Sequence, residues 1–365
     1  MRPSDNRRYD VDAVRVFALL LLIFTHAQAA FSEAAPVYRL IAPSTAVSDS
    51  AFFRALDFIY LLVSIWRIPI LFVVAGMAAR FSLAHRTLAA FSVERFRRIG
   101  IPLLFGSLVV FPIALYLSMS HYKGDGAYVI ATGHLWFLVN ILIYVCLLVA
   151  VVWLLGRLGL KDGRLSRLPR DPRILVAAFA VAVMALAAIL NPERFGDWTD
   201  GRISLVFGLL CFIGGYGAAA AGDAFRQWTE RRAGSFLASA VALFVFRLMA
   251  IGHDIAPLGL ALPRNLLNAA VGLEMTFWIL AVMAYFARLV KTSTPALRYA
   301  TAAVFPVYIV HYPIQNALAW SIQDALGNRV VLFLLLIALE TLACLLVFEG
   351  VRRIRGIRVL FGMRA

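Results

Sequence analysis

The sequence predicts an all-α polytopic membrane protein, and its composition, its hydropathy and the recurrence of its apolar stretches indicate this class. Of the 365 residues, 62% are hydrophobic and only 15% are charged, and the mean hydropathy is +0.84. A soluble domain of this length exposes far more charge. The apolar stretches approach the roughly twenty residues that a helix needs to cross a hydrocarbon core about 30 Å thick. We therefore predict a single membrane domain over residues 1–365, with no separate soluble domain.

About ten segments fit a membrane-spanning helix, because each is almost continuously apolar and long enough to cross the bilayer. The predicted spans are 11–31, 57–79, 99–119, 132–155, 173–190, 203–221, 234–252, 265–287, 299–320 and 330–350.

The basic residues predict the orientation of these spans. If the N-terminus is cytoplasmic, 25 of the 35 Lys and Arg residues lie on the cytoplasmic side, seven lie on the opposite side and three lie within spans. This bias is the positive-inside rule, and it predicts that both termini are cytoplasmic. The net charge of +15 is therefore an orientation signal, and we expect no nucleic-acid partner. The basic tail, with Arg352, Arg353, Arg355 and Arg358, is interpreted in the same way, as a signal read against anionic lipid.

The N-terminus also imitates a secretory signal peptide. Arg2, Arg7 and Arg8 precede an apolar stretch, and Ala27-Gln28-Ala29 imitates a small-residue cleavage site. We favour retention of the first span, because the remaining loops satisfy the positive-inside rule only when that span is counted.

Cofactor motifs are not found in the sequence. Cys146, Cys211 and Cys344 fall inside predicted spans without metal-ligand spacing, so we interpret them as small apolar residues. There is no Walker loop, dinucleotide fingerprint or zinc motif. We predict no metal site and no permanently bound cofactor. The glycines of Ile213-Gly214-Gly215-Tyr216-Gly217 are interpreted as sites of close helix packing.

The first span carries ionisable residues that lipid disfavours. Arg15 and His26 are eleven residues apart, which is three helical turns plus about 20°, so both side chains share one helix face, and Asp12 lies on the same stripe. Such residues should face a protein-lined cavity. Asp12 is either a structural counter-charge to Arg15 or part of a pair that positions a ligand, and both interpretations stay open.

Arginines gather in the loop after the second span. Arg95, Arg97 and Arg98 immediately precede Ile99-Gly100-Ile101-Pro102, where we expect the third span to begin. Guanidinium groups together with the free backbone N–H groups of a helix start make an anion site. Topology alone also explains these charges, but a phosphorylated ligand from the cytosol would suit this place.

Two further histidines lie in candidate spans. His134 and Trp136 belong to Gly133-His134-Leu135-Trp136-Phe137-Leu138, where Trp136 is typical of an interfacial anchor. His311 lies near mid-membrane with Tyr308 and Tyr312, beside Pro313, which frees a backbone carbonyl.

Taken together, these motifs resemble the acyltransferase-3 family of integral membrane acyltransferases, and they are closest to its glucan-biosynthesis-protein-C branch. The resemblance covers nearly the whole chain, in the right order and topology. The motifs are Arg15-x10-His26, Arg67-Ile68-Pro69-Ile70-Leu71-Phe72-Val73-Val74-Ala75-Gly76, Glu94-Arg95-Phe96-Arg97-Arg98-Ile99-Gly100-Ile101-Pro102, Gly133-His134-Leu135-Trp136-Phe137-Leu138 and Tyr308-x2-His311.

The resemblance implies transfer of an acyl group, succinyl or acetyl, from cytosolic acyl-CoA to a hydroxyl of an extracytoplasmic glucan or polysaccharide. It implies a multi-pass protein of the bacterial inner membrane. His26 inherits the catalytic role, with Arg15 and Asp12 beside it on the stripe. Arg15, Arg95, Arg97 and Arg98 inherit donor binding, and the matching pair among the last three stays open. Residues expected at the acceptor or outer site are His134, Trp136, His311, Tyr308 and Arg67.

The chemistry of these residue types agrees with donor binding by the arginines and catalysis by His26. Arginine binds the phosphates of an acyl-CoA bidentately, and a neutral imidazole accepts the proton of an attacking hydroxyl. We favour direct transfer with His26 as general base over an acyl-histidine intermediate.

Two alternatives stay open. One is a secondary transporter or exporter, in which the buried charges couple transport, although spans 1–5 and 6–10 do not echo each other as inverted repeats would. The other is an acyltransferase acting on a lipid or a small secreted molecule. The sequence does not predict the acyl group or the oligomeric state.

Overall fold

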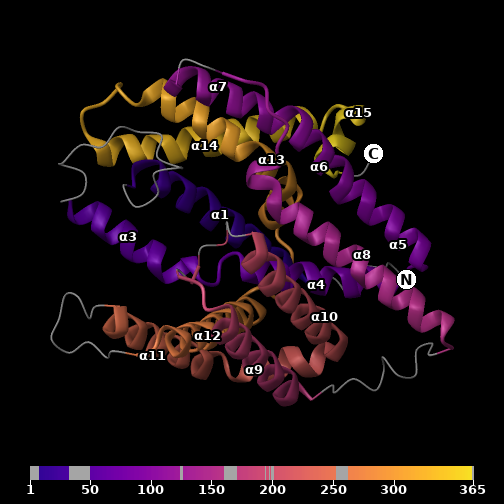
Figure 1. The fold of residues 1–365 in the computed structure, drawn as a ribbon. Coiled ribbons are helices and arrows are strands. Elements are labelled where there is room, and N and C mark those ends of the chain that lie inside the picture. The colour runs from indigo at the N-terminus through magenta and orange to yellow at the C-terminus, as the bar shows by residue number, and fades with distance from the viewer. Residues whose placement is uncertain are drawn as a thin grey trace. The chain divides into compact units, whose positions relative to one another are not determined.

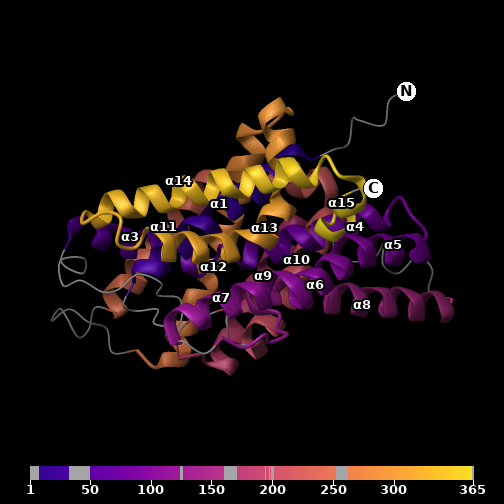
Figure 2. The same ribbon diagram turned by 90° about the horizontal axis from the view of Figure 1, so that it is seen from above.

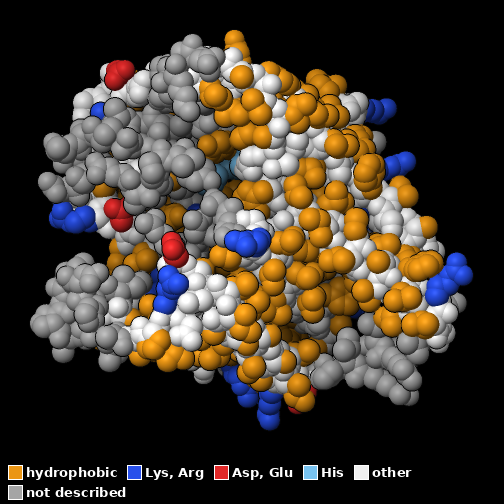
Figure 3. Space-filling view, in the orientation of Figure 1, with side chains coloured by type: hydrophobic (Ala, Val, Ile, Leu, Met, Phe, Trp, Pro, Cys, Tyr) orange, Lys and Arg blue, Asp and Glu red, His pale blue; other side chains and the backbone are white. Residues whose placement is uncertain are grey.

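The computed structural model confirms the all-helical membrane class (Figure 1). It describes residues 8–32, 50–123, 126–159, 171–193, 195–196, 198, 201–251 and 262–363, without the side chains of 117, 118, 121–123 and 251. All regular elements in these ranges are helices. Apolar side chains cover much of the face in Figure 3, as expected of a surface in contact with lipid.

Nine helices in the described part of the chain are long and apolar enough to cross a membrane. They are Tyr9–Phe31, Ala51–Leu83, Leu88–Tyr116, Gly133–Arg157, Pro172–Leu190, Gly201–Arg231, Ala233–Ala250, Arg264–Leu289 and Arg329–Val351. The remaining predicted span, 299–320, is also helical, within Pro295–Ile322. It does not reach the hydropathy of the other nine, because it carries His311, Gln315 and Asn316.

Two compact units are distinguished by their internal contacts, and each is assembled from three stretches of the chain. The first comprises the described parts of Met1–Ala18, Leu62–Phe91 and Tyr144–Thr294, and the second those of Leu19–Leu61, Ser92–Ile143 and Pro295–Ala365. α1 (Tyr9–Phe31), α3 (Ala51–Ser64), α5 (Leu88–Arg95) and α8 (Trp136–Arg157) each contribute residues to both units. The first unit otherwise contains α4 (Pro69–Leu83), α9 (Pro172–Leu190), α10 (Gly201–Arg231), α11 (Ala233–Ile251) and α12 (Arg264–Leu289).

The second unit contains the remaining elements. They are η1 (Phe96–Gly100), α6 (Ile101–Phe105), η2 (Gly106–Val110), α7 (Phe111–Lys123), η3 (Gly133–Leu135), α13 (Pro295–Ile322), α14 (Arg329–Val351), α15 (Arg355–Arg358) and η6 (Val359–Phe361).

The predicted second span, 57–79, consists of two helices. α3 ends at Ser64, a turn follows at 65–68, and α4 begins with Pro69. Proline has no backbone N–H and is preferred at the first position of a helix, so the new start falls there. Within the first unit, the indole Nε1 of Trp198 donates to the carbonyl of Ser64 at 2.9 Å and satisfies this carbonyl at the buried end of α3.

The predicted start of the third span, at residue 99, is wrong. The helix begins at Leu88 and continues through η1, α6 and η2 into α7. Arg95, Arg97 and Arg98 therefore lie inside a helix, whose backbone N–H groups are already engaged. The charged sequence suggested a loop, but arginine has good helix propensity, so the helix extends beyond the apolar core.

Helices α4 and α10 of the first unit pack through glycine. A Cβ at Gly76 would overlap the backbone carbonyl of Phe212, and one at Gly215 would overlap that of Val73. Only a residue without a side chain permits this approach of the two backbones. The predicted packing role of the glycine-rich stretch is confirmed for Gly215.

The first unit also buries an ion pair. Arg247 donates from Nε to Glu274 Oε2 at 2.7 Å and from Nη2 to Oε1 at 3.0 Å, and Trp278 Nε1 donates to the same carboxylate at 3.1 Å. Arg247 is 3% exposed and Glu274 is fully buried, so each charge needs the other.

In the second unit, α13 and α14 form an antiparallel helical hairpin (Figures 1 and 2). Ala319 and Leu332 share a hydrophobic cluster near the connecting turn, while Tyr299 and Phe348 meet near the opposite ends. The same cluster includes Ala27 of α1. This packing holds the second half of α1 against the hairpin.

Candidate functional site

Three predicted site histidines meet in the second unit. The ring centroids of His26 on α1 and His311 on α13 are 5.2 Å apart, and those of His311 and His134 on η3 are also 5.2 Å apart. The ring centroid of Tyr312 lies 5.6 Å from that of His26 and 5.3 Å from that of His134. The ring centroids of Tyr308 and His311 are 5.9 Å apart. We call these five residues the histidine cluster.

Backbone carbonyls of α13 orient two of the imidazoles. His134 Nε2 donates to the carbonyl of Ile309 at 3.1 Å, and His311 Nδ1 donates to the carbonyl of Tyr308 at 2.7 Å. Since a carbonyl only accepts, each bond places the ring hydrogen on the bonded nitrogen and leaves the other nitrogen as a lone-pair acceptor. His311 Nε2 has no hydrogen-bond partner among the described residues.

Pro313 provides one of these carbonyls. A helical residue at 313 would donate its N–H to the carbonyl of Ile309, four positions earlier, but proline has none. His134 takes the available oxygen. In the opposite direction, the hydroxyl of Tyr308 donates to the carbonyl of His134 at 2.7 Å. The expectation that this proline frees a carbonyl is confirmed, and the carbonyl holds a histidine.

Burial differs within the cluster. His311 is fully buried, whereas His26, His134, Tyr308 and Tyr312 are half-buried. A reacting group would therefore meet His26 or His134 more directly than His311. Among the residues that the structure describes, no group of three or more His, Cys, Asp or Glu side chains could hold a metal ion.

Asp12 and Arg15 lie on the earlier part of α1. Arg15 Nη1 is 3.5 Å from Asp12 Oδ1, so the predicted pair is confirmed. α1 is an unbroken helix from Tyr9 to Phe31, and eleven residues place Arg15 about 16 Å from His26 along its axis.

The three donor-loop arginines differ in their surroundings. Arg95 Nε is 3.3 Å from Glu94 Oε2, and Arg98 Nη1 is 3.2 Å from Glu94 Oε1. The Arg95 side chain is 14% exposed and that of Arg98 is 49% exposed, while Arg97 is exposed. Glu94 therefore offsets part of their charge. An anion here would be held by guanidinium groups rather than by free backbone N–H groups.

Two further predicted outer-site residues are Trp136 and Arg67. Trp136 begins α8 and lies beside Phe137, with ring centroids 6.4 Å apart. Arg67 belongs to the first unit, where it is buried at 8% exposure in the turn between α3 and α4. The structure thus brings together His26, His134, His311 and Tyr308, and Trp136 follows His134 by two residues.

Sequence reasoning gave no role to several residues around the cluster. Phe111 on α7 lies 6.0 Å from His134 and stacks on Tyr312 at 6.5 Å. Gln315 and Asn316 lie one helical turn beyond His311 and Tyr312, and both are buried. The four-residue spacing of these polar side chains within an apolar helix was the available signal.

Comparison with known proteins agrees with this geometry. The profile of an acyltransferase domain, that of the acyltransferase-3 family, matches residues 8–349. This range includes every predicted site residue and all five members of the histidine cluster. No curated protein and no solved structure gives a significant match. A match over nearly the whole chain is decisive, and the chain belongs to the acyltransferase-3 family of membrane acyltransferases.

Proposed function

We propose that this protein moves an acyl group from cytosolic acyl-CoA to a hydroxyl of an extracytoplasmic carbohydrate, such as a periplasmic glucan or a surface polysaccharide, in the bacterial inner membrane. The observation that carries the proposal is the histidine cluster, which joins α1, η3 and α13. His26 lies against the rings of His311 and Tyr312, and a neutral imidazole suits proton transfer from a hydroxyl.

The proposed reaction is a direct transfer. His26 takes the proton of the acceptor hydroxyl while the oxygen attacks the thioester carbonyl, so that an ester C–O bond forms and the C–S bond breaks. The CoA thiolate leaves and takes up the proton from the imidazolium. His311 lies beside His26 and positions it, since His311 is itself anchored to the carbonyl of Tyr308.

The donor side of the proposal uses arginine. Arg95, Arg97 and Arg98 bind the phosphates of acyl-CoA by charge-assisted hydrogen bonds. Arg15, paired with Asp12, lies three turns before His26 on α1, and its proposed role is to contact the pantetheine arm. The narrow arm then follows the polar stripe toward the histidine cluster.

The acceptor side uses the remaining members of the cluster. His134 and Tyr308 are linked through Tyr308 Oη and the His134 carbonyl, and Trp136 follows in the next turn, where an aromatic ring suits stacking on a sugar. A succinyl group would need a cation for its carboxylate. We propose Arg67 for this task, because it belongs to the family-like motif at residues 67–76.

Substitution of His26 tests the proposal. We expect His26→Ala to lower acyl transfer by roughly 10²- to 10⁴-fold, the usual contribution of a general base, with donor affinity unchanged. The matched control is His85→Ala, at an exposed histidine outside the cluster, which should retain full activity. The measurement is mass spectrometry of cell-envelope glycans, where the added mass identifies the acyl group. Full acceptor modification by His26→Ala would refute the mechanism.

A further inference from the structure

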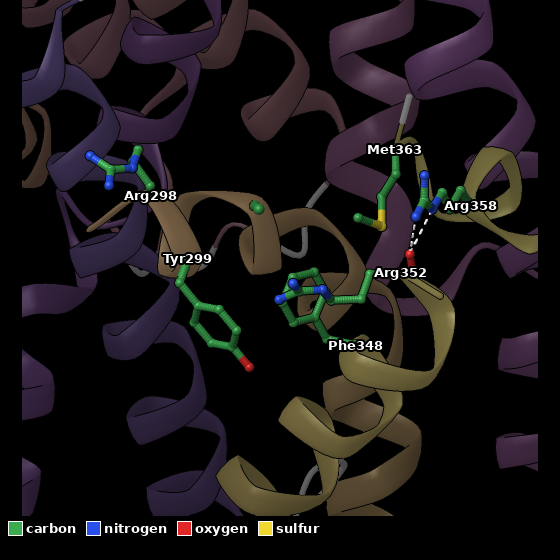
Figure 4. Close-up of a pocket in the computed structure, with 7 residues that line it drawn as sticks. Arg298, Tyr299, Phe348, Arg352, Arg358 and Met363 are labelled. Carbon is green, nitrogen blue, oxygen red and sulfur yellow. Dashed lines mark hydrogen bonds between the residues drawn. The ribbon is translucent and has the colours of Figure 1, made fainter. Parts of the chain in front are cut away.

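A pocket opens where the start of α13, the end of α14 and the C-terminal segment meet, all within the second unit. It has a volume of about 450 Å³. Its lining includes three arginines, two aromatic rings and a methionine (Figure 4): Arg298, Tyr299, Phe348, Arg352, Arg358 and Met363. The proposed donor loop does not include any of these residues.

The C-terminal segment is folded back to form one wall. After α14 ends at Val351, the chain turns into α15 and η6. Arg358 donates to the backbone carbonyl of Arg352 from Nε at 2.7 Å and also from Nη2 (Figure 4). This contact fixes the Arg358 guanidinium at the pocket and leaves three of its five N–H groups for other acceptors.

Aromatic rings form the floor. Tyr299 and Phe348 meet edge to face, with centroids 5.3 Å apart. The Arg352 guanidinium carbon lies 5.7 Å from the centroid of each ring. Stacked arginine is preorganised for planar or phosphate ligands, because its side chain loses little further freedom on binding.

The local charge remains strongly positive. Glu349 is the acidic partner here, with Arg352 Nη1 at 3.0 Å and Arg353 Nη2 at 3.2 Å. It neutralises at most one of the arginines around the pocket. Arg358, whose hydrogen bonds go to a backbone carbonyl, therefore adds positive charge next to the aromatic floor.

The segment is also tied to the helix that carries the donor-loop arginines. An added Cβ at Gly362, where φ is +66°, would lie 2.8 Å from the backbone oxygen of Arg98 and from the ring of Phe305. The ring of Phe361 packs against that of Phe105 of α6, with centroids 5.4 Å apart. Glycine permits both the left-handed backbone and the close approach, so the pocket wall packs directly on η1.

We propose that this pocket is a binding site for a phosphate ester. Charges that only orient a helix need neither a cavity nor fixed guanidinium groups. A pocket with three arginines and two aromatic rings matches a phosphate attached to a flat or apolar group. Two cytosolic-side sources share this chemistry: the nucleotide end of the acyl donor and the headgroup of an anionic phospholipid. The donor assignment rests on the proposed function.

The test uses the full-length protein in phosphatidylcholine nanodiscs. One arm measures the affinity of coenzyme A and of adenosine 3′,5′-bisphosphate by calorimetry, and the other measures phosphatidylglycerol retention by native mass spectrometry. We expect Arg352→Gln and Arg358→Gln each to lower the affinity for one of these ligands at least tenfold, because each variant loses a charged hydrogen bond to it. Arg355→Gln is the matched control, because Arg355 is exposed on the same segment and does not line the pocket. It should change affinity less than twofold.

Each outcome decides the proposal. Weaker nucleotide binding assigns the donor, and weaker lipid retention assigns the phospholipid. Unchanged binding of both ligands, or an equal loss in Arg355→Gln, would overturn the site. Arg352→Lys keeps the charge and should bind the ligand with intermediate affinity. This result would show that the weaker binding of Arg352→Gln is not caused by unfolding.

The experiment also separates the pocket from the proposed function. Binding through Arg352 and Arg358 in a protein that transfers no acyl group would retain the pocket and reject the proposed reaction. Full acyl transfer by both glutamine variants, with unchanged affinities, would retain the proposed reaction and reject the pocket as a binding site.

Discussion

His311 shows at the scale of one residue how a buried side chain is prepared for function. Its Nδ1 is engaged by the carbonyl of Tyr308, and its Nε2 has no partner among the described residues. An unpartnered polar atom in a fully buried side chain costs free energy. We therefore propose that His311, which lies beside His26, serves the reaction rather than stability.

Replacement of His311 separates its two nitrogens. Asparagine places an amide nitrogen near the position of Nδ1, so His311→Asn should keep the bond to Tyr308 and lose the second nitrogen. We expect kcat to fall at least tenfold with an unchanged KM for the donor, as for a group that acts only in the transition state. His311→Gln, whose amide reaches the Nε2 position, should lose less. Steady-state kinetics of acyl transfer measures both, and wild-type kcat in His311→Asn would contradict the role.

Helix α13 shows how a whole element prepares the site. It contains Pro306 and Pro313 in its interior, where proline weakens a helix and leaves carbonyls unbonded. At Pro313 the open carbonyl, that of Ile309, holds His134. The weakness of the helix is therefore used to orient an imidazole that comes from a distant part of the chain.

A substitution at Pro313 tests whether the open Ile309 carbonyl is needed to orient His134. Pro313→Ala restores an N–H that competes for the Ile309 carbonyl, so we expect a higher Tm, because a proline inside a helix costs about 3 kcal/mol, together with roughly tenfold slower acyl transfer. Pro306→Ala is the control, because it restores a bond to Ala302, outside the histidine cluster, and should leave the rate unchanged. A full rate in Pro313→Ala would show that the His134 contact is dispensable.

At the scale of the whole molecule, the predicted topology depends on α13. The nine apolar helices among the described residues would by themselves place the two termini on opposite sides of a membrane, whereas α13 as a tenth span would place them on the same side. The positive-inside bias favours the second arrangement, and we predict that both termini are cytoplasmic. The polar residues that keep α13 from reaching the apolarity of the other nine include those of the histidine cluster, so its weak hydropathy follows from function.

Reporter fusions measure this directly. We expect a green fluorescent protein fused to either terminus to fluoresce, and alkaline phosphatase fused at either terminus to stay inactive, since the first folds in the cytosol and the second needs an oxidising compartment. A fusion after Ser321, near the outer end of α13, should give the opposite pattern. An active phosphatase at the C-terminus would show that α13 does not cross.

The sequence by itself determined the membrane class, most of the spans, the Asp12–Arg15 pair and the family motifs. These depend on local hydropathy and on spacings of three, four or eleven residues within one helix, which a chain displays before it folds. The tertiary structure decided which distant residues meet. It joined His26 with His134 and His311, gave Glu274 to Arg247, and folded the C-terminal arginines around a pocket. Such contacts depend on how helices pack, and packing is set by side-chain shape across segments far apart in the chain, which no local pattern encodes.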